Sequence, residues 1–231
     1  MKFRVNTSKE AVEETSGSSY ISKSGIYDVE IAFASLDVSK NGAESVNFNL
    51  NYNGNSQTIY GPYVTNKDGN VNEIGAKLIN KLAIVSGMDD GDEFEIEEET
   101  HNVGKDNKPQ EFAVITNFSE LPIKIRLQEE YSINPKKNEI QKRLVVKNFF
   151  RAEDNASAKE IIDGDNSKFG THYALEEEKY ADNVTYKDGL TSEDVEEWKK
   201  AMTEAAKSGS TTPKPKTTKA PTTKKAGGLF K

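Results

Sequence analysis

The sequence predicts a mainly β domain with one inserted helix. Two stretches alternate apolar and polar residues, with apolar positions at Tyr27, Val29, Ile31 and Phe33 and at Val46, Phe48, Leu50 and Tyr52. A period of two is typical of half-buried antiparallel strands. Residues 74–85 instead repeat apolar residues every three or four positions, as an amphipathic helix does. The change of period separates the early strands from the later ones.

Tight turns join the early strands. Asn41-Gly42 and Asn53-Gly54 lie between the alternating runs. Asn-Gly supplies the positive φ values that a short hairpin turn needs. We expect a third strand around residues 58–63, directly before the helical pattern.

The apolar stripe of the predicted helix consists of Ile74, Leu78, Leu82 and Val85. Gly87 suits the left-handed residue that commonly follows a helix end. Lys77 and Lys81 point away from this stripe, so we expect them to lie in solvent.

Strand patterns resume after the helix in DEFEIEEE, EFAVITNF, LPIKIRL and QKRLVVKNFF. Three strands, a helix and then further strands is the order of the OB-fold, a small antiparallel barrel that often binds single-stranded nucleic acid. The fold prediction is therefore an OB-fold-like barrel over residues 20–151. A β-sandwich with one inserted helix is the alternative.

Charge and composition divide the rest of the chain. Residues 1–19 are balanced and form an N-terminal extension, whereas residues 152–190 are acidic, poorly periodic and predicted as loops. Residues 191–207 predict a helix capped by Thr191, and its apolar stripe comprises Val195, Trp198 and Met202. Residues 208–231 are rich in Thr, Pro and Lys, so we expect a disordered basic tail.

Composition disfavours an enzyme. The chain has no cysteine and two histidines, His101 and His172, which excludes disulfides, thiolate metal sites and a multi-histidine centre. No Gly-rich phosphate loop is present, and the acidic run MDDGDEFEIEEE lacks the ligand spacing of an EF-hand, so we expect no cofactor, no metal site and no metal-dependent nuclease. No apolar run approaches the length of a membrane span, which predicts a soluble cytoplasmic protein with no membrane partner.

A basic hairpin stands out in this acidic chain of net charge −7. Residues 121–151 hold eight Lys and Arg against three Glu. If Ile123, Ile125 and Leu127 face the core, Lys124 and Arg126 lie on the opposite face. If strand residues Leu144 and Val146 also face inward, Arg143, Lys147 and Phe149 join that outer face.

Binding of single strands without sequence preference requires cations that contact phosphates and flat rings on which bases stack. The predicted nucleic-acid-binding residues are Lys124, Arg126, Tyr131, Lys136, Lys137, Arg143, Lys147, Phe149 and Arg151, with Tyr60 and Tyr63 from the segment IYGPYV. The alternative is an ordinary solvated strand face, with Phe149 and the tyrosines packed in the interior.

Three segments, SGIYDVEIAFASLDVSKNG, ESVNFNLNYNG and NEIGAKLINKLAIVSGM, together resemble bacteriophage single-stranded-DNA-binding proteins of the OB-fold type. The resemblance covers residues 20–150. It implies a non-catalytic protein that coats single-stranded DNA without strong sequence preference during phage DNA replication or recombination, in the host cytoplasm.

The C-terminal part of the chain departs from the group that it resembles. Many proteins of that group end in an acidic tail, whereas residues 207–231 carry seven lysines and no acid. Replication proteins are the partners expected for the stripe of Val195, Trp198 and Met202. The alternative function is a non-catalytic β-rich phage structural or adaptor protein.

Overall fold

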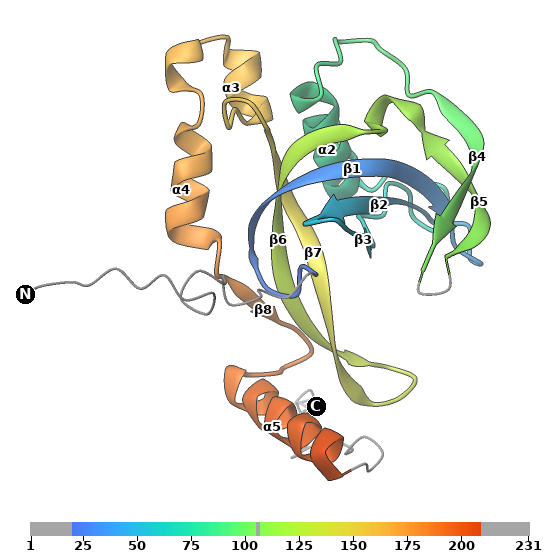
Figure 1. Ribbon diagram of the computed structural model, residues 1–231, viewed down its shortest axis with the longest axis vertical. Helices are drawn as coiled ribbons and strands as arrows, with labels where there is room; N and C mark the ends of the chain where they lie inside the picture. Colours follow the sequence, from blue (N-terminus) through green and yellow to red (C-terminus); the bar gives the residue numbers. More distant parts are fainter. Residues whose placement is uncertain (1–19, 105–106, 209–231) are drawn as a thin grey trace, which may run out of the picture. The chain divides into compact units, whose positions relative to one another are not determined.

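The computed structural model describes residues 20–104 and 107–208. It is mainly β and antiparallel, as the sequence predicts (Figure 1). The chain separates into two compact units. Unit 1 contains the residues up to Glu130 and Arg143–Thr185, and unit 2 contains Tyr131–Lys142 and the residues from Tyr186 onward. The predicted N-terminal extension and the tail from residue 209 lie outside the described residues.

Unit 1 begins with an antiparallel meander of β1 (Gly25–Val38), β2 (Glu44–Tyr52) and β3 (Asn55–Ile59). The predicted Asn53-Gly54 turn is present, with φ values of 49° and 76°. β3 ends at Ile59, before the predicted residues 60–63, and the N–H of Gly61 donates to the side chain of Asn47 at 3.2 Å instead of a backbone carbonyl of β2.

Strand β1 organises the sheet because it pairs with different strands along its two halves. β2 lies along one edge, while the other edge pairs first with β6 (Leu121–Asn134) and then with β5 (Lys108–Ile115). The register shifts between Ile31 and Phe33. Beyond this bulge Ala34 joins the core, and Phe33 instead stacks on His101 with ring centroids 3.9 Å apart.

Helix α2 (Glu73–Val85) lies between β3 and β4 (Ile96–Val103), and β4 forms a hairpin with β5. Leu78, Leu82 and Val85 are buried as predicted. The prediction for Ile74 is wrong, since its side chain is exposed. In that first turn Gly75 faces the protein instead, and a Cβ there would lie 1.9 Å from the carbonyl oxygen of Tyr63.

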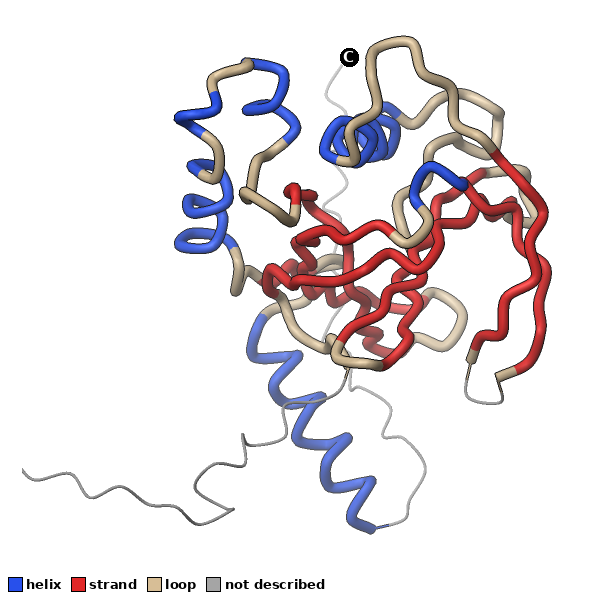
Figure 2. The backbone as a smooth tube through the Cα atoms, turned by 45° about the horizontal axis from the view of Figure 1, so that its top comes forward, coloured by secondary structure: helices blue, strands red, loops and turns tan. Residues whose placement is uncertain are grey.

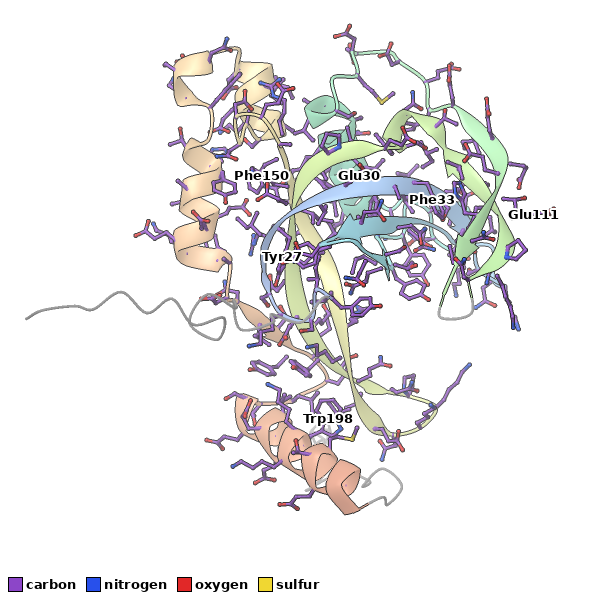
Figure 3. All side chains as sticks on the ribbon, in the orientation of Figure 1. Tyr27, Glu30, Phe33, Glu111, Phe150 and Trp198 are labelled. Atoms are coloured by element: carbon purple, nitrogen blue, oxygen red, sulfur yellow. The ribbon has the colours of Figure 1, made fainter. Side chains whose placement is uncertain are left out.

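The core of unit 1 confirms the predicted facing of β6, because Ile123, Ile125 and Leu127 are buried. The predicted outward position of Phe149, on β7 (Glu139–Arg151), is wrong. Phe149 is buried, and its ring meets Phe48 at 5.5 Å. Val146 and Phe149 both belong to the core, so strict alternation fails between them. The next residue, Phe150, is buried too and meets the ring of Tyr173 (Figure 3).

Residues 152–190, predicted as loops, contain α3 (Ala158–Asp163), η2 (Asn166–Lys168), α4 (Thr171–Tyr180) and β8 (Val184–Tyr186). A capping box of Ser157 and Glu160 begins α3. The Glu160 carboxylate also accepts the backbone N–H of His172, at 2.9 Å. The pKa of Glu160 lies below its ordinary value. Burial by itself would raise this pKa, but the hydrogen bonds from Ser157 and His172 to the carboxylate lower it by more. Helix α4 has no fully buried residue, so its sequence carries little helical period.

Unit 2 has a small aromatic core of its own. Tyr131 is buried, and its ring lies 6.0 Å from Tyr186 and 6.1 Å from Trp198 of α5 (Ser192–Ser208). Figure 3 labels Trp198 on this helix. The predicted cap is present, because Thr191 Oγ1 accepts the backbone N–H of Asp194. A buried Tyr131 cannot stack on a base, so its predicted binding role is wrong.

The helix stripe predicted to bind replication proteins is largely used within the chain. Val195 is buried and Trp198 contacts Tyr131, which leaves Met202 as the exposed member. Among the described helices, none is long and apolar enough to cross a membrane.

Within the described residues the sheet does not close into a complete barrel. The paired strands follow the order β3-β2-β1-β5-β4, with β6 joining β1 to β7 and β8. Figure 2 shows the strands and the helices of the described chain in separate colours. The order of three strands, one helix and further strands is the predicted one.

Truncating the ring of Phe149 tests its place in the core. We expect Phe149→Ala to lower the free energy of unfolding by about 3–5 kcal/mol, because a buried aromatic ring is replaced by a cavity. Urea unfolding measures this, with Tyr60→Ala as the control that removes an exposed ring and changes stability by less than about 0.5 kcal/mol. An unchanged stability in Phe149→Ala would place the ring on the surface.

Candidate nucleic-acid interface

Helix α4 lies against the part of β6 and β7 that contains Arg126 and Asn148. Arg126 of β6 donates from Nη1 to Oε2 of Glu176, at 2.8 Å, and Asn148 of β7 donates to Oε1 of the same carboxylate, also at 2.8 Å. One side chain of α4 therefore holds both strands. The Arg126 and Glu176 side chains retain 12% and 19% of their exposure, so this ion pair is mostly removed from water.

Helix α4 also places aromatic rings over the cations of β6. The Tyr173 ring centroid lies 5.9 Å from Nζ of Lys124, and the Tyr180 ring lies 5.4 Å from the Arg126 guanidinium. Lys124 is in addition paired with Asp28. The predicted facing of Lys124 and Arg126 is confirmed, but their predicted role as an open binding face is wrong. An acidic helix occupies that face.

The remaining predicted cations of β7 are partly engaged. Nε of Arg143 donates to Oε1 of Glu130 at 2.6 Å, and Nη2 of Arg151 donates to Oδ2 of Asp154, also at 2.6 Å. The Asp154 hydrogen bond raises the pKa of Arg151, and the same bond lowers the pKa of Asp154. Lys147 is half-buried. These residues do not form one continuous cationic surface.

Two predicted cations are exposed at the tip of the β6–β7 hairpin, which belongs to unit 2. Oδ1 of Asn134 accepts the backbone N–H groups of Lys136 and Lys137, at 3.0 and 3.2 Å. This turn orders the backbone and leaves both lysine side chains exposed. The tip is therefore a candidate phosphate contact by itself.

A different surface of unit 1 exposes the two remaining predicted residues. The Tyr60 and Tyr63 side chains are 77% and 51% exposed. Their backbone is held firmly, since the carbonyl oxygen of Pro62 accepts the N–H of Val46 at 3.1 Å. A Cβ on Gly61 would lie 1.7 Å from the carbonyl oxygen of Val46, so only glycine fits there. Close packing of the backbone thus fixes the loop and leaves the rings in solvent.

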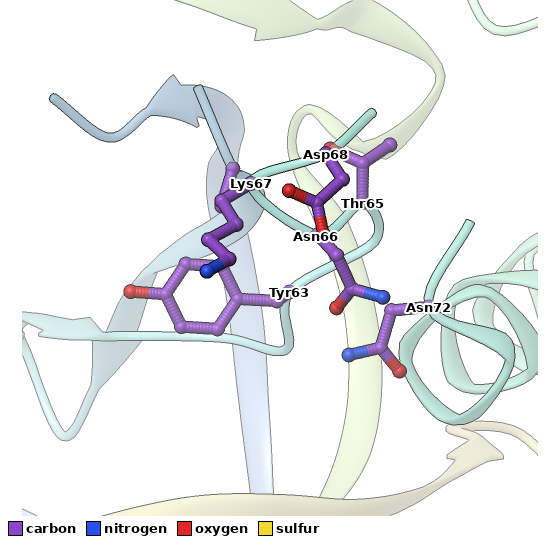
Figure 4. Close-up of a pocket in the computed structure, with 7 residues that line it drawn as sticks. Tyr63, Thr65, Asn66, Lys67, Asp68 and Asn72 are labelled. Atoms are coloured by element: carbon purple, nitrogen blue, oxygen red, sulfur yellow. The ribbon is translucent and has the colours of Figure 1, made fainter. Parts of the chain in front are cut away.

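A pocket of about 330 Å³ opens beside Tyr63. Figure 4 shows its lining, which consists of Ala43, Tyr63, Thr65, Asn66, Lys67, Asp68 and Asn72. The loop that carries these residues is pinned at both ends. Thr65 Oγ1 accepts the N–H of Glu44 at 3.0 Å, and Asn72 Oδ1 accepts the N–H of Gly75 to cap α2.

The β1–β2 turn lies next to this pocket. A Cβ on Gly42 would be 3.7 Å from the backbone oxygen of Lys67, so the turn that carries Lys40 borders the loop. We define the loop surface as Lys40, Tyr60, Tyr63, Asn66 and Lys67. Its two flat rings suit stacking on bases, and its two ammonium groups suit phosphates. Its amide suits hydrogen bonds to base edges. The nearby Asp68 keeps it only weakly basic.

Lys40, Asn66 and Lys67 are absent from the residues that the sequence predicts. Strand periodicity directs attention to the β6–β7 hairpin, where the cations are densest. The useful signal was the polar segment TNKDGN between a strand and a helix, because binding residues often lie on loops that a rigid scaffold positions.

No three His, Asp or Glu side chains within the described parts of the chain are grouped so that they could hold a metal ion. No family model matches the chain, and no curated protein matches it either. What the loop surface binds must therefore be inferred from its own residues.

A double-mutant cycle measures how strongly α4 is tied to β6. We expect Arg126→Ala and Glu176→Ala to show a coupling energy of about 1–3 kcal/mol in urea unfolding, because the pair is mostly buried. The matched control is the Lys77–Glu73 pair on α2, whose solvent-exposed ions are 3.3 Å apart. Its coupling should be about 0.3–0.5 kcal/mol. Equal coupling in both pairs would mean that α4 is not held by Arg126.

Proposed function

We propose that this protein binds single-stranded nucleic acid through the loop surface. The observation that carries the proposal is the pair of exposed tyrosine rings on a backbone that Gly61 and Gly75 fix by close packing. A loop whose backbone is already fixed loses little backbone entropy when bases stack on the rings that it carries. Lys67 and Lys40 lie where they can reach the adjoining phosphates.

The loop surface favours unpaired bases. Stacking on a tyrosine needs the flat face of a base, which a duplex covers on both sides. The two lysines attract phosphates only weakly, because the neighbouring Asp68 carries the opposite charge, so charge alone does not retain a duplex. We infer a preference for single strands with little dependence on sequence, since every base offers a flat face.

The connectivity of the strands supports an OB-fold-like architecture. α2 lies between β3 and β4, and β5 and β6 run antiparallel to β1 in succession, separated by η1 (Thr116–Phe118). In an OB-fold-like architecture these two strands together would take the place of one strand. OB-folds bind nucleic acid with the loop between strands 1 and 2 and with the last hairpin loop. Lys40 belongs to the first loop, and Lys136 and Lys137 belong to the last.

Binding of single strands at the loop surface agrees with the resemblance to phage proteins that coat single-stranded DNA during replication or recombination. The proposal assigns the stacking to Tyr60 and Tyr63 and leaves Phe149 and Tyr131 to the interior. Lys136 and Lys137 contribute as a separate cationic contact.

Binding of labelled oligo-dT, followed by fluorescence anisotropy across a salt series, tests the proposal. Each of Tyr60→Ala and Tyr63→Ala should weaken binding by about 1–3 kcal/mol, or roughly 5-fold to 150-fold, at an unchanged salt slope. Lys67→Ala should reduce the slope by about 0.7, because one phosphate contact is lost. The slope of the unaltered protein should itself be shallow, about −1.4 to −2.8 for two to four contacts.

Two controls separate these effects. Tyr63→Phe keeps a ring and should retain most of the affinity, and Lys81→Ala removes a lysine from the solvated side of α2 and should change nothing. Unimpaired binding in the Tyr60/Tyr63 double variant would move the interface elsewhere. Absence of binding to any oligonucleotide at low salt would reject the function and favour a non-catalytic adaptor.

A further inference from the structure

A second hollow of unit 1 has a composition unlike the loop surface. Its volume is about 550 Å³, and it lies between the end of α2, the segment that follows, and α3. Ile84, Met88, Phe94, Ile161 and Ile162 provide its apolar side chains. Figure 1 shows α2 and α3 as neighbouring helices. We call this hollow the α2–α3 groove.

The apolar lining is incompletely covered. Ile162 is 69% exposed although it sits on a helix, and Phe94 is also exposed. Apolar groups gathered in a concave site are the usual sign of a ligand or a docked segment. The groove takes no part in the nucleic-acid interface, whose rings lie on the loop after β3.

The rim of the α2–α3 groove is acidic. Asp89, Asp90 and Asp92 line it and are exposed. Oδ2 of Asp92 accepts the backbone N–H of Asp89 at 2.8 Å, which orders the rim. The occupant that fits best is therefore a short segment with a bulky apolar pair flanked by cations. A nucleic-acid strand does not meet this description, because its phosphates would face the aspartates.

The chain itself contains such a segment, outside the described residues. KKAGGLFK, residues 224–231, places Leu229 and Phe230 between Lys225 and Lys231. These two are the bulky apolar side chains of residues 209–231, a stretch otherwise made of small, proline and basic residues without any acid. A fully extended stretch of that length spans up to about 80 Å, so it can reach a distant surface.

We propose that residues 224–231 dock in the α2–α3 groove, with Phe230 among Ile84, Met88 and Ile162 and with the lysines on the aspartate rim. The groove thus binds a segment of the same chain, from the same or a neighbouring copy. This contact does not depend on the nucleic-acid interface. In this proposal the lysine-rich segment binds a protein surface. It therefore acts differently from an acidic tail, which would compete with DNA.

Photocrosslinking in the full chain tests the docking. With p-benzoylphenylalanine in place of Phe230, irradiation should give crosslinks concentrated at residues 84–94 and 161–162, read by mass spectrometry. The same group at Pro221 is the control and should crosslink diffusely. Ile162→Asp should lower the groove crosslinks at least fivefold, and because its side chain is exposed, circular dichroism and urea unfolding should stay unchanged.

Photocrosslinking also identifies any other segment that occupies the α2–α3 groove. Mixing isotopically light and heavy chains tells contacts within one copy from contacts between copies, and either result supports the docking. A photoreactive group at position 162 should capture residues 224–231. Capture of another described surface of a second copy by the group at position 162 would overturn the proposal. The proposal would also be overturned if the group at position 230 formed no crosslinks to the groove, or if Ile162→Asp left the yield of those crosslinks unchanged.

Discussion

A guanidinium that has lost most of its water needs a carboxylate, and Arg126 obtains one from a helix 50 residues further along the chain. Glu176 accepts a hydrogen bond from Arg126 with one carboxylate oxygen and from Asn148 with the other, so a single side chain ties α4 to two strands. Tyr173 and Tyr180 then lie over the cations of β6. The acidic stretch of the chain is in this way a neighbour of the basic stretch, and the local charge excess of residues 121–151 is largely balanced inside the fold.

Because the cations on that face of β6 are paired with acidic and aromatic side chains, the candidate binding surface lies elsewhere on unit 1. With Lys124 and Arg126 engaged, unit 1 still exposes Tyr60 and Tyr63, on a loop whose backbone is closely packed. Gly61 and Gly75 let the loop approach β2 and α2 so closely that no other residue fits, and the loop presents Tyr60 and Tyr63 outward. A rigid loop with exposed rings can bind bases without reorganising. The apolar α2–α3 groove, with its aspartate rim, offers a surface of different chemistry suited to a basic peptide.

Much of the fold could be predicted because alternation and the Asn-Gly turns are local signals. They predict β1, β2 and the inward row of Ile123, Ile125 and Leu127, and the change to a helical period predicts α2, all of which the structure confirms. Phe149 could not be placed, since its facing depends on an irregular step after Val146. Helix α4 could not be predicted from the sequence, because it buries no residue completely and therefore has no apolar stripe. It is held instead by Glu176 and by aromatic contacts. At the candidate site, Tyr60 and Tyr63 were predicted, whereas Lys40 required knowing that the β1–β2 turn borders the loop.

The central claim is that single strands bind at the loop surface while the outer face of β6 and β7 stays covered by α4. Titrating the ¹⁵N-labelled full chain with oligo-dT, and following backbone amide shifts by NMR, measures both halves of this claim together. The account predicts shifts in the turn around Gly42 and in residues 60–69, with residues 123–127 and 144–150 unmoved. Shifts concentrated along residues 123–127 and 144–150, with the loop unmoved, would contradict it, because α4 would then have to leave Arg126 for the strand to bind.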